Sequence, residues 1–197
     1  MINIYNHIVK RSLDVVASAS GLVIMSPVYL FLAIVVKSTS KGDVLFRQER
    51  IGKNGKPFMI YKFRTMVFDA EKDGPQLSYP DDKRVTSSGR WMRKYRLDEL
   101  PQLWNVLKGD MSFIGPRPER YVYIQEIMKE LPEYSRLWNV MPGLSSRGVI
   151  KNGYAKNVQE MIRRSRYDLE YLDRRGFVDD LKILKDTLKI IILGRGV

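Results

Sequence analysis

The longest apolar run of the chain covers residues 15–36, VVASASGLVIMSPVYLFLAIVV, and holds 22 positions without a charged side chain. As one helix it would extend about 33 Å, enough to cross the hydrocarbon core of a bilayer. Ser26 and Pro27 lie at its middle, where proline removes a backbone donor and its ring clashes with the preceding turn. We therefore predict a membrane segment that breaks at Ser26 and Pro27 into arms of about 18 and 15 Å.

Positive charges flank this segment on both sides. Lys10 and Arg11 precede it, with Asp14 able to pair with either, and two lysines and a strongly basic remainder follow it. The positive-inside rule then assigns both ends to the cytoplasmic side. A helix-break-helix that enters and leaves the same leaflet explains both this charge bias and the short arms. A proline-kinked single span is the main alternative. A buried soluble helix or a signal peptide fits less well. The prediction is a re-entrant membrane helix over residues 1–40 and a cytoplasm-facing domain over residues 41–197.

The second part of the chain alternates short β-prone runs with helical patterns. Residues 44–48 and 58–63 flank the sequence GKNGK, in which Asn54-Gly55 is a strong turn signal, so a β-hairpin is predicted. A polar loop over residues 67–90 leads to a short helix near 90–95. Further helices are predicted over 119–130, 158–174 and 178–193, and a glycine-punctuated loop or strand over 144–154. The fold class is α+β, mainly helical, with helices packed at the membrane interface.

The last predicted helix is amphipathic. Leu181, Leu184 and Leu188 share a face with residues 191–193, whereas lysines at 182, 185 and 189 lie elsewhere on the helix. This pattern is compatible with packing on the core, the commoner explanation, or with a position at a membrane interface.

The stretch RLDELPQLWNVLKGDMSFIGPRP, residues 96–118, combines a helical pattern with clustered charges. Leu100, Leu103, Trp104 and Leu107 recur at helical spacing, and Gly109 stands where a C-terminal cap belongs. The stretch therefore predicts one short helix that is closed by a glycine.

Two adjacent carboxylates, Asp98 and Glu99, fall at the amino end of this helix. Acids are expected in any first helical turn, where they offset the macrodipole by roughly 0.3–1 kcal/mol. Their neighbours favour a functional role as well, because Arg93 and Arg96 lie close by and Arg117 follows between two prolines. Guanidinium groups suit bidentate phosphate contact, so carboxylates, a phosphate and a divalent cation could converge here.

Composition limits the function classes. A net charge of +12 over 197 residues points to an anionic partner, and nucleic acid, anionic lipid and phosphorylated small molecules all qualify. The chain has no cysteine, which excludes disulfides and thiolate metal sites, and its single histidine makes histidine-based catalysis or a zinc cluster improbable.

These motifs together resemble a known family. KRSLD, the apolar run with central Ser26-Pro27, FRQERIGKNGKPFMIYKFRTM, RVTSSGRWMRKYRLDELPQLWNVLKGDMSFIGPRPE and MPGL are similar to the small monotopic phosphoglycosyl transferases of the bacterial sugar transferase family. The resemblance covers nearly the whole chain and is strongest over residues 46–118. It implies transfer of a phospho-sugar from a UDP-sugar to polyprenol (undecaprenyl) phosphate, with release of UMP, as the first membrane step of glycoconjugate assembly at the cytoplasmic face of the bacterial inner membrane.

The resemblance also implies roles for single residues. Asp98 would be the nucleophile that forms a covalent phospho-sugar, and Glu99, with Asp98 beside it, would hold Mg²⁺. Lys62, Arg93 and Arg117 match basic family positions and are expected to bind the diphosphate or the lipid phosphate. The substrate-binding candidates are Lys62, Arg93, Arg117 and Arg84. The expected partners are a UDP-sugar, polyprenol phosphate and membrane lipid, and no nucleic acid.

The chain departs from the family pattern at two places. Arg96 stands where the family commonly has Ser or Thr, and residues 142–151, PGLSSRGVIK, replace the common PGITGLAQVNGR. The transferred sugar, the pathway and the oligomeric state are not readable from the sequence. A membrane-tethered nucleic-acid binder and an adaptor without catalysis are the alternatives, although both leave the clustered acids unexplained.

Overall fold

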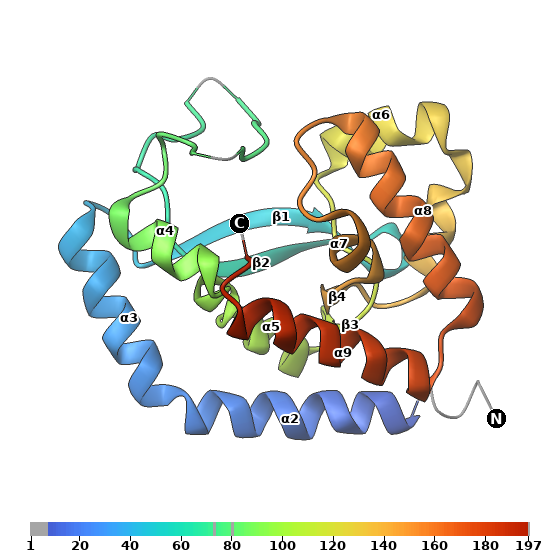
Figure 1. Cartoon of the computed structure of the whole chain (residues 1–197), viewed down its shortest axis with the longest axis horizontal. Coiled ribbons are helices and arrows are strands. Elements are labelled where there is room, and N and C mark those ends of the chain that lie inside the picture. The colour runs from blue at the N-terminus through green and yellow to red at the C-terminus, as the bar shows by residue number, and fades with distance from the viewer. Residues whose placement is uncertain (1–7, 73, 80, 197) are drawn as a thin grey trace.

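The computed structural model describes residues 8–196 apart from residues 73 and 80. Its described part is mainly helical, with one antiparallel strand pair and one short parallel pair, which confirms the predicted class (Figure 1). The elements, in chain order, are α2 (Lys10–Ile24), α3 (Ser26–Thr39), β1 (Leu45–Ile51), η2 (Lys53–Gly55), β2 (Pro57–Phe63), α4 (Ser87–Lys94), η3 (Leu97–Glu99), α5 (Gln102–Lys108), β3 (Ser112–Ile114), α6 (Tyr121–Glu130), η4 (Pro132–Asn139), β4 (Gly143–Ser145), α7 (Arg147–Asn152), α8 (Val158–Arg174) and α9 (Phe177–Ile192).

The apolar N-terminal run forms two helices rather than one. Helices α2 and α3 meet at Met25 and are bent by 62°, and Pro27 lies in the first turn of α3, where its missing N–H is not needed. Within the described residues no single helix has both the length and the apolar character to cross a bilayer, and only this bent pair has them jointly. The predicted break is therefore confirmed. No side chain caps the start of α3, so the Ser26 hydroxyl does not do so.

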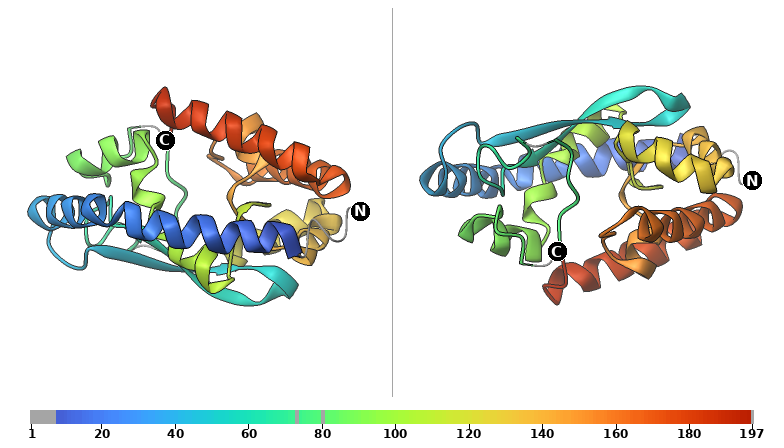
Figure 2. Two further views of the ribbon diagram at one scale, coloured as in Figure 1. Left: turned by 90° about the horizontal axis from the view of Figure 1, so that it is seen from below. Right: turned by 90° about the horizontal axis from the view of Figure 1, so that it is seen from above.

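Polar residues at the start of α2 join it to the rest of the protein. Arg11 donates to the carbonyls of Val106 and Leu107, near the carboxyl end of α5, with N–O distances of 2.6 and 2.8 Å. Lys10 pairs with Asp180 of α9 at 2.6 Å. Asp14 accepts a hydrogen bond from a backbone N–H of β3, so its expected ion pair with Lys10 or Arg11 is replaced by this contact. Figure 2 shows α2 and α9 converging at their amino ends.

The predicted hairpin is confirmed. Strands β1 and β2 pair antiparallel from Leu45 opposite Phe63 to Ile51 opposite Pro57. Asn54 and Gly55 both adopt positive φ, 59° and 70°, which is why this dipeptide makes the reversal.

The principal core lies where α6, η4 and α8 meet. Ile124, Ile127, Leu131, Tyr134 and Met161 are buried there in one cluster. A second cluster joins the anchor to the rest of the fold and consists of Leu32, Val36, Phe63 and Met92. The second half of the α2–α3 pair therefore packs directly on the hairpin and on α4.

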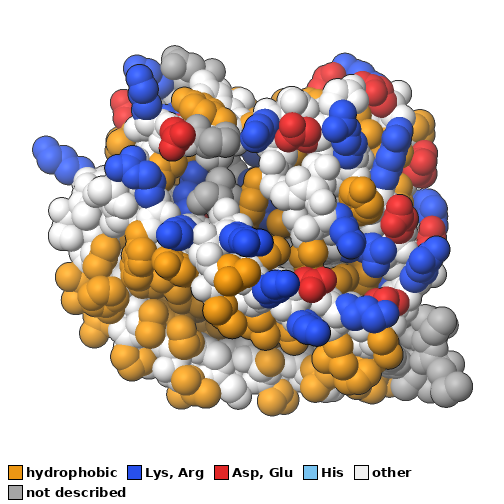
Figure 3. All heavy atoms as spheres, in the orientation of Figure 1, with side chains coloured by type: hydrophobic (Ala, Val, Ile, Leu, Met, Phe, Trp, Pro, Cys, Tyr) orange, Lys and Arg blue, Asp and Glu red, His pale blue; other side chains and the backbone are white. Residues whose placement is uncertain are grey.

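Two expectations are corrected by the structure. Residues 144–154 are not only loop or strand, because they include helix α7 with Ser146 as its side-chain cap. The apolar face of α9 does not pack on the core: Leu181, Leu184 and Leu188 remain exposed, the last by 50%. Ile183 and Thr187 contact the interior instead. Figure 3 shows apolar side chains gathered over α2 and α3, with a row of Lys and Arg side chains above them.

Candidate active site

A cavity of about 260 Å³ lies between the hairpin, the loop after β2, η3 and the segment that begins at Arg117. Among the described residues its charged lining comprises seven cations and four acids: Arg50, Lys62, Arg64, Arg93, Arg117, Arg120, Arg164, Glu71, Asp98, Glu99 and Glu119. A surplus of buried positive charge favours an anionic ligand.

The backbone around Asp98 and Glu99 explains their position. Arg96 adopts a left-handed conformation, φ 54° and ψ 24°, which turns the chain out of α4 into η3. Pro101 then precedes α5, and Gly109 ends it at φ 98°, as predicted. The turn leaves Asp98 and Glu99 only 6% and 5% exposed while both still line the cavity.

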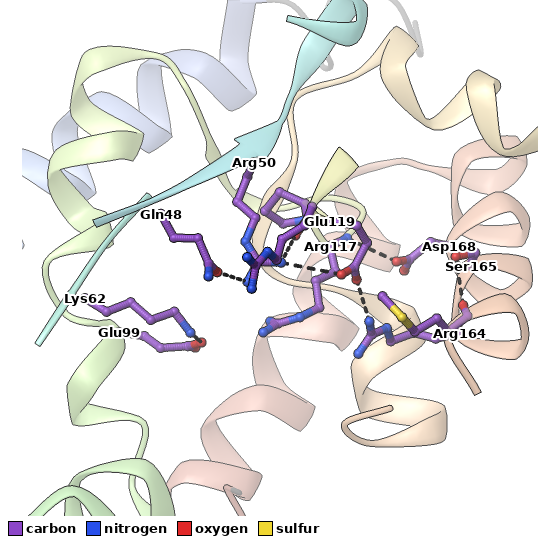
Figure 4. A network of polar contacts seen from close by, with 12 residues as sticks. Gln48, Arg50, Lys62, Glu99, Arg117, Glu119, Arg164, Ser165 and Asp168 are labelled. Carbon is purple, nitrogen blue, oxygen red and sulfur yellow. Dashed lines mark hydrogen bonds and ion pairs between the residues drawn. The ribbon is translucent and has the colours of Figure 1, made fainter. Parts of the chain in front are cut away.

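Glu99 is held by two cations. Its Oε1 accepts from Lys62 Nζ at 2.8 Å, and its Oε2 accepts from Arg96 Nε and Nη2 at 2.9 and 2.5 Å (Figure 4 shows the Lys62 contact). Burial alone would raise the pKa of this carboxyl, but Arg96 and Lys62 outweigh burial and hold the pKa of Glu99 well below its usual range. Glu99 is therefore ionised at neutral pH.

Asp98 has a different environment. Among the described residues, no group donates a hydrogen bond to its carboxylate or pairs with it within ion-pair distance. Burial raises the pKa of Asp98, and Lys62 and Arg93 act against that rise. Asp98 therefore presents a buried carboxylate to the cavity, and within the described residues no other side chain is bonded to it.

Two of the predicted phosphate-binding residues present uncompensated charge to the same cavity. Arg93 is oriented by the hydroxyls of Thr65 and Ser78, at 3.0 and 2.8 Å. The Arg117 guanidinium lies over the ring of Tyr154, 5.0 Å from its centroid. Neither guanidinium forms an ion pair with a carboxylate in the part of the chain that the structure describes. The structure therefore brings Lys62, Arg93 and Arg117 together with the two acids, as predicted.

Arg84 does not join this group. Its guanidinium donates to both carboxylate oxygens of Asp82 and to Gln76, Ala70 and Leu77. These contacts use the donors of Arg84 inside the loop that follows β2, and Arg84 does not line the cavity. In this structure Arg84 therefore holds that loop, and its expected substrate contact stays a prediction.

Sequence reasoning missed several residues of the site. Asp168 accepts the backbone N–H groups of Arg117 and Gly148, at 3.1 and 2.7 Å, and so fixes the Arg117 turn against α7. Burial raises the pKa of Asp168 to about 6, against the effect of these two bonds.

Figure 4 shows a second network beside it, in which Glu119 bridges Arg50 and Arg164. Nothing in the sequence paired Glu119 with Arg50 and Arg164, which lie 69 and 45 positions away along the chain.

The donor set fits a magnesium ion that also binds substrate oxygens. No group of three or more His, Cys, Asp or Glu side chains is arranged for a metal within the described residues. An ionised carboxylate has about four lone-pair directions, and Glu99 uses three of them, so one remains on Oε1. With the open carboxylate of Asp98, that gives two protein ligands, and Mg²⁺ in phosphoryl-transfer sites commonly takes one or two carboxylates together with substrate phosphates.

Comparison with known proteins agrees with this geometry. A family model described as bacterial sugar transferase matches residues 5–194. A UDP-N-acetylgalactosamine-undecaprenyl-phosphate N-acetylgalactosaminephosphotransferase of Aeromonas hydrophila is 38% identical over 95% of this chain, which spans 44% of that protein. A UDP-glucose:undecaprenyl-phosphate glucose-1-phosphate transferase of Caulobacter vibrioides is 38% identical over 93% of this chain and 69% of its own length. An uncharacterized sugar transferase of Bacillus subtilis is 39% identical over 96% of this chain and 90% of its own length.

Proposed function

Because the chain belongs to the bacterial sugar transferase family, we propose that it transfers a sugar 1-phosphate from a UDP-sugar to undecaprenyl phosphate, giving undecaprenyl-diphosphate-sugar and UMP. The observation that carries this proposal is the buried carboxylate of Asp98 at one cavity with Arg93 and Arg117, neither of which forms an ion pair with a carboxylate within the described residues. An anionic nucleophile and an anionic substrate can approach each other only where cations offset their repulsion.

The reaction runs in two displacements at one phosphorus. In the first, a carboxylate oxygen of Asp98 attacks the sugar-bearing phosphorus, the bond from that phosphorus to the bridging oxygen breaks, and UMP leaves with the bridging oxygen. In the second, an oxygen of undecaprenyl phosphate attacks the same phosphorus and the aspartyl–phosphorus bond breaks. Asp98 is regenerated, and atoms and charge balance over the two steps.

The surrounding side chains divide the other tasks. Arg93 and Arg117 are placed to bind phosphate oxygens, because each has donors that no carboxylate occupies. Lys62 links Glu99 to the cavity and offsets the charge of Asp98. When bound, Mg²⁺ would be held by Glu99 Oε1 and Asp98 and would neutralise charge on the substrate diphosphate.

The α2–α3 pair supports a monotopic position at the cytoplasmic face of the membrane. Its 62° bend, the uncharged run over residues 15–36 and the exposed residues Val23, Ile24, Leu30 and Phe31 fit a re-entrant hairpin in one leaflet. The exposed apolar face of α9, with lysines 182, 185 and 189 on the same helix, fits the interface between lipid and water. This position would bring a lipid-borne phosphate and an aqueous nucleotide sugar to one site.

A UMP-release assay tests the reaction. The purified protein in nanodiscs is given undecaprenyl phosphate, Mg²⁺ and, separately, UDP-N-acetylgalactosamine, UDP-N-acetylglucosamine, UDP-glucose and UDP-galactose. Release of more than one UMP per protein, dependent on the acceptor lipid, is the expected result with at least one nucleotide sugar, because without the acceptor the reaction stops after the first displacement; the responding nucleotide identifies the sugar. A folded protein that releases UMP from none of them would refute the proposal for these substrates.

A further inference from the structure

Arg96 combines an unusual backbone conformation with a buried side chain that bonds to Glu99 and Leu144. Its φ of 54° lies in the left-handed region, which glycine adopts readily and arginine rarely. The turn from α4 into η3 requires this conformation, yet the position holds a long cationic side chain that is only 8% exposed. A residue kept in a disfavoured backbone conformation at a site is a reason to ask what its side chain does there.

The guanidinium of Arg96 ties Glu99 to a neighbouring strand. Its Nε and Nη2 both donate to Glu99 Oε2, and Nη2 also donates to the carbonyl of Leu144 in β4 at 2.9 Å. Both lone-pair directions of Oε2 are thereby used, and Lys62 uses one of the two on Oε1. A metal that binds Glu99 is left a single direction on one oxygen.

The same contacts set the charge of the free site. Arg96 and Lys62 lie against Glu99, and Arg93 and Arg117 add positive charge to the same cavity, so the free site is net positive and disfavours a lone divalent cation. Without Arg96, Glu99 would lose one of its two cationic partners and both lone-pair directions of Oε2 would be open to a cation. A nucleotide diphosphate, in contrast, carries its own negative charge and can bring the cation with it.

We propose that Arg96 is a positioning residue that compensates Glu99 and restricts it to one free oxygen direction, so that the divalent cation enters together with the nucleotide diphosphate instead of binding beforehand. The proposal rests on the proposed function, because it concerns the same site and substrate. Arg96, which stands where the family commonly has Ser or Thr, would then help to decide whether the cation or the nucleotide binds first.

Direct binding of Mn²⁺, followed by electron paramagnetic resonance of the free ion, tests this without turnover. The unmodified protein should retain Mn²⁺ at least fivefold more tightly with UDP present than without it, after correction for Mn²⁺ bound by UDP in solution. Arg96→Gly keeps the left-handed backbone and removes the cation, so Mn²⁺ affinity without UDP should rise at least fivefold. Arg96→Asn, which also tolerates positive φ, should behave alike and covers the case in which the glycine variant does not fold.

Two further variants separate charge from general structure. Arg96→Lys keeps the positive charge but loses the paired Nε and Nη2 donors to Glu99. Its Mn²⁺ affinity without UDP should therefore stay within threefold of the parent while its rate of UMP release falls. Asn54→Gly alters another left-handed residue, at the hairpin turn, and should change neither quantity.

A rise of less than fivefold in both Arg96→Gly and Arg96→Asn, or tight Mn²⁺ binding by the parent without UDP, would overturn the proposal. If the parent released no UMP with any nucleotide sugar, the proposed function would fail, and the Mn²⁺ measurements would still decide the role of Arg96.

Discussion

Replacement of Lys62 by methionine gives the sharpest test of how neighbouring cations oppose the effect of burial on the pKa of Asp98. Lys62 Nζ lies 2.8 Å from Glu99 Oε1, and it is the leading cation that opposes the effect of burial on the pKa of Asp98. Methionine has a similar length and no charge. Glu99 would keep Arg96 as a partner, whereas Asp98 would keep the weaker effects of Arg93 and Arg96.

The expected size follows from simple electrostatics. A cation within about 4–6 Å lowers a carboxyl pKa by about 1–3 units. At an effective dielectric constant of about 20, two unit charges about 4 Å apart interact by about 4 kcal/mol, and one pKa unit corresponds to about 1.4 kcal/mol, so the two estimates agree. Loss of Lys62 should therefore raise the pKa of Asp98 further, beyond the rise that burial already causes.

The sign of the effect on activity is fixed by the chemistry. A nucleophilic carboxylate must be ionised, so activity is lost as the pH falls through the pKa of Asp98. In Lys62→Met the acidic limb of the rate of UMP release should move to higher pH by about 1–3 units. The plateau should fall as well, since Lys62 also faces the substrate cavity.

The assay is initial UMP release between pH 5 and pH 9, in nanodiscs at saturating Mg²⁺. Lys62→Arg keeps the charge and should leave the acidic limb near its original place. Lys108→Met removes a lysine that is paired with Asp110 and 53% exposed in its side chain, and should change neither limb nor plateau. A limb in Lys62→Met that stays within about 0.3 pH unit of the parent would refute the reasoning, whatever happens to the plateau.

Three further predictions concern the nucleophile, the anchor and the strand pair. Asp98→Asn should abolish both UMP release and capture of radiolabelled phospho-sugar on the protein, and an adduct that survives this change would contradict the assignment of the nucleophile. In this cysteine-free chain, Ile8→Cys and Asp43→Cys should both react with an impermeant maleimide only from the cytoplasmic side, and labelling of either from the opposite side would refute the re-entrant anchor. Gly115→Ala should destabilise the fold by about 1–3 kcal/mol in thermal unfolding, because its Cβ would lie 2.3 Å from a backbone carbonyl oxygen. Gly176→Ala, whose nearest contact would be 3.9 Å away, is the control and should unfold near the parent temperature.

Features that depend on a few neighbouring residues were predictable from the sequence. The helix break at Ser26 and Pro27, the hairpin turn at Asn54-Gly55 and the cap at Gly109 all follow from local steric preferences. The placement of Asp98 and Glu99 just before α5 is of the same kind, although the structure puts them in the separate turn η3 and not in the helix itself.

The partners of charged side chains were less predictable. Arg84 and Arg93 are both arginines near the loop that follows β2. The structure pairs Arg84 with Asp82, whereas Arg93 lines the cavity. Likewise, the leucines of α9 have a pattern that suits either a core or an interface, and only the packing of α9 on α7, β3 and β4 shows that Leu188 stays exposed. Each outcome depends on which distant segment lies alongside, and a periodic pattern does not contain that information.

The sequence by itself determined where the helices break and end, which two carboxylates are adjacent, and that anionic ligands are favoured by a net charge of +12. The tertiary structure decided how those carboxylates differ. Glu99 is enclosed by Lys62 and Arg96, whereas Asp98 is left open to the cavity. The reason is physical: adjacent residues share a backbone, but the ionisation and availability of each side chain depend on burial and on charges that only the folded chain brings within a few ångströms.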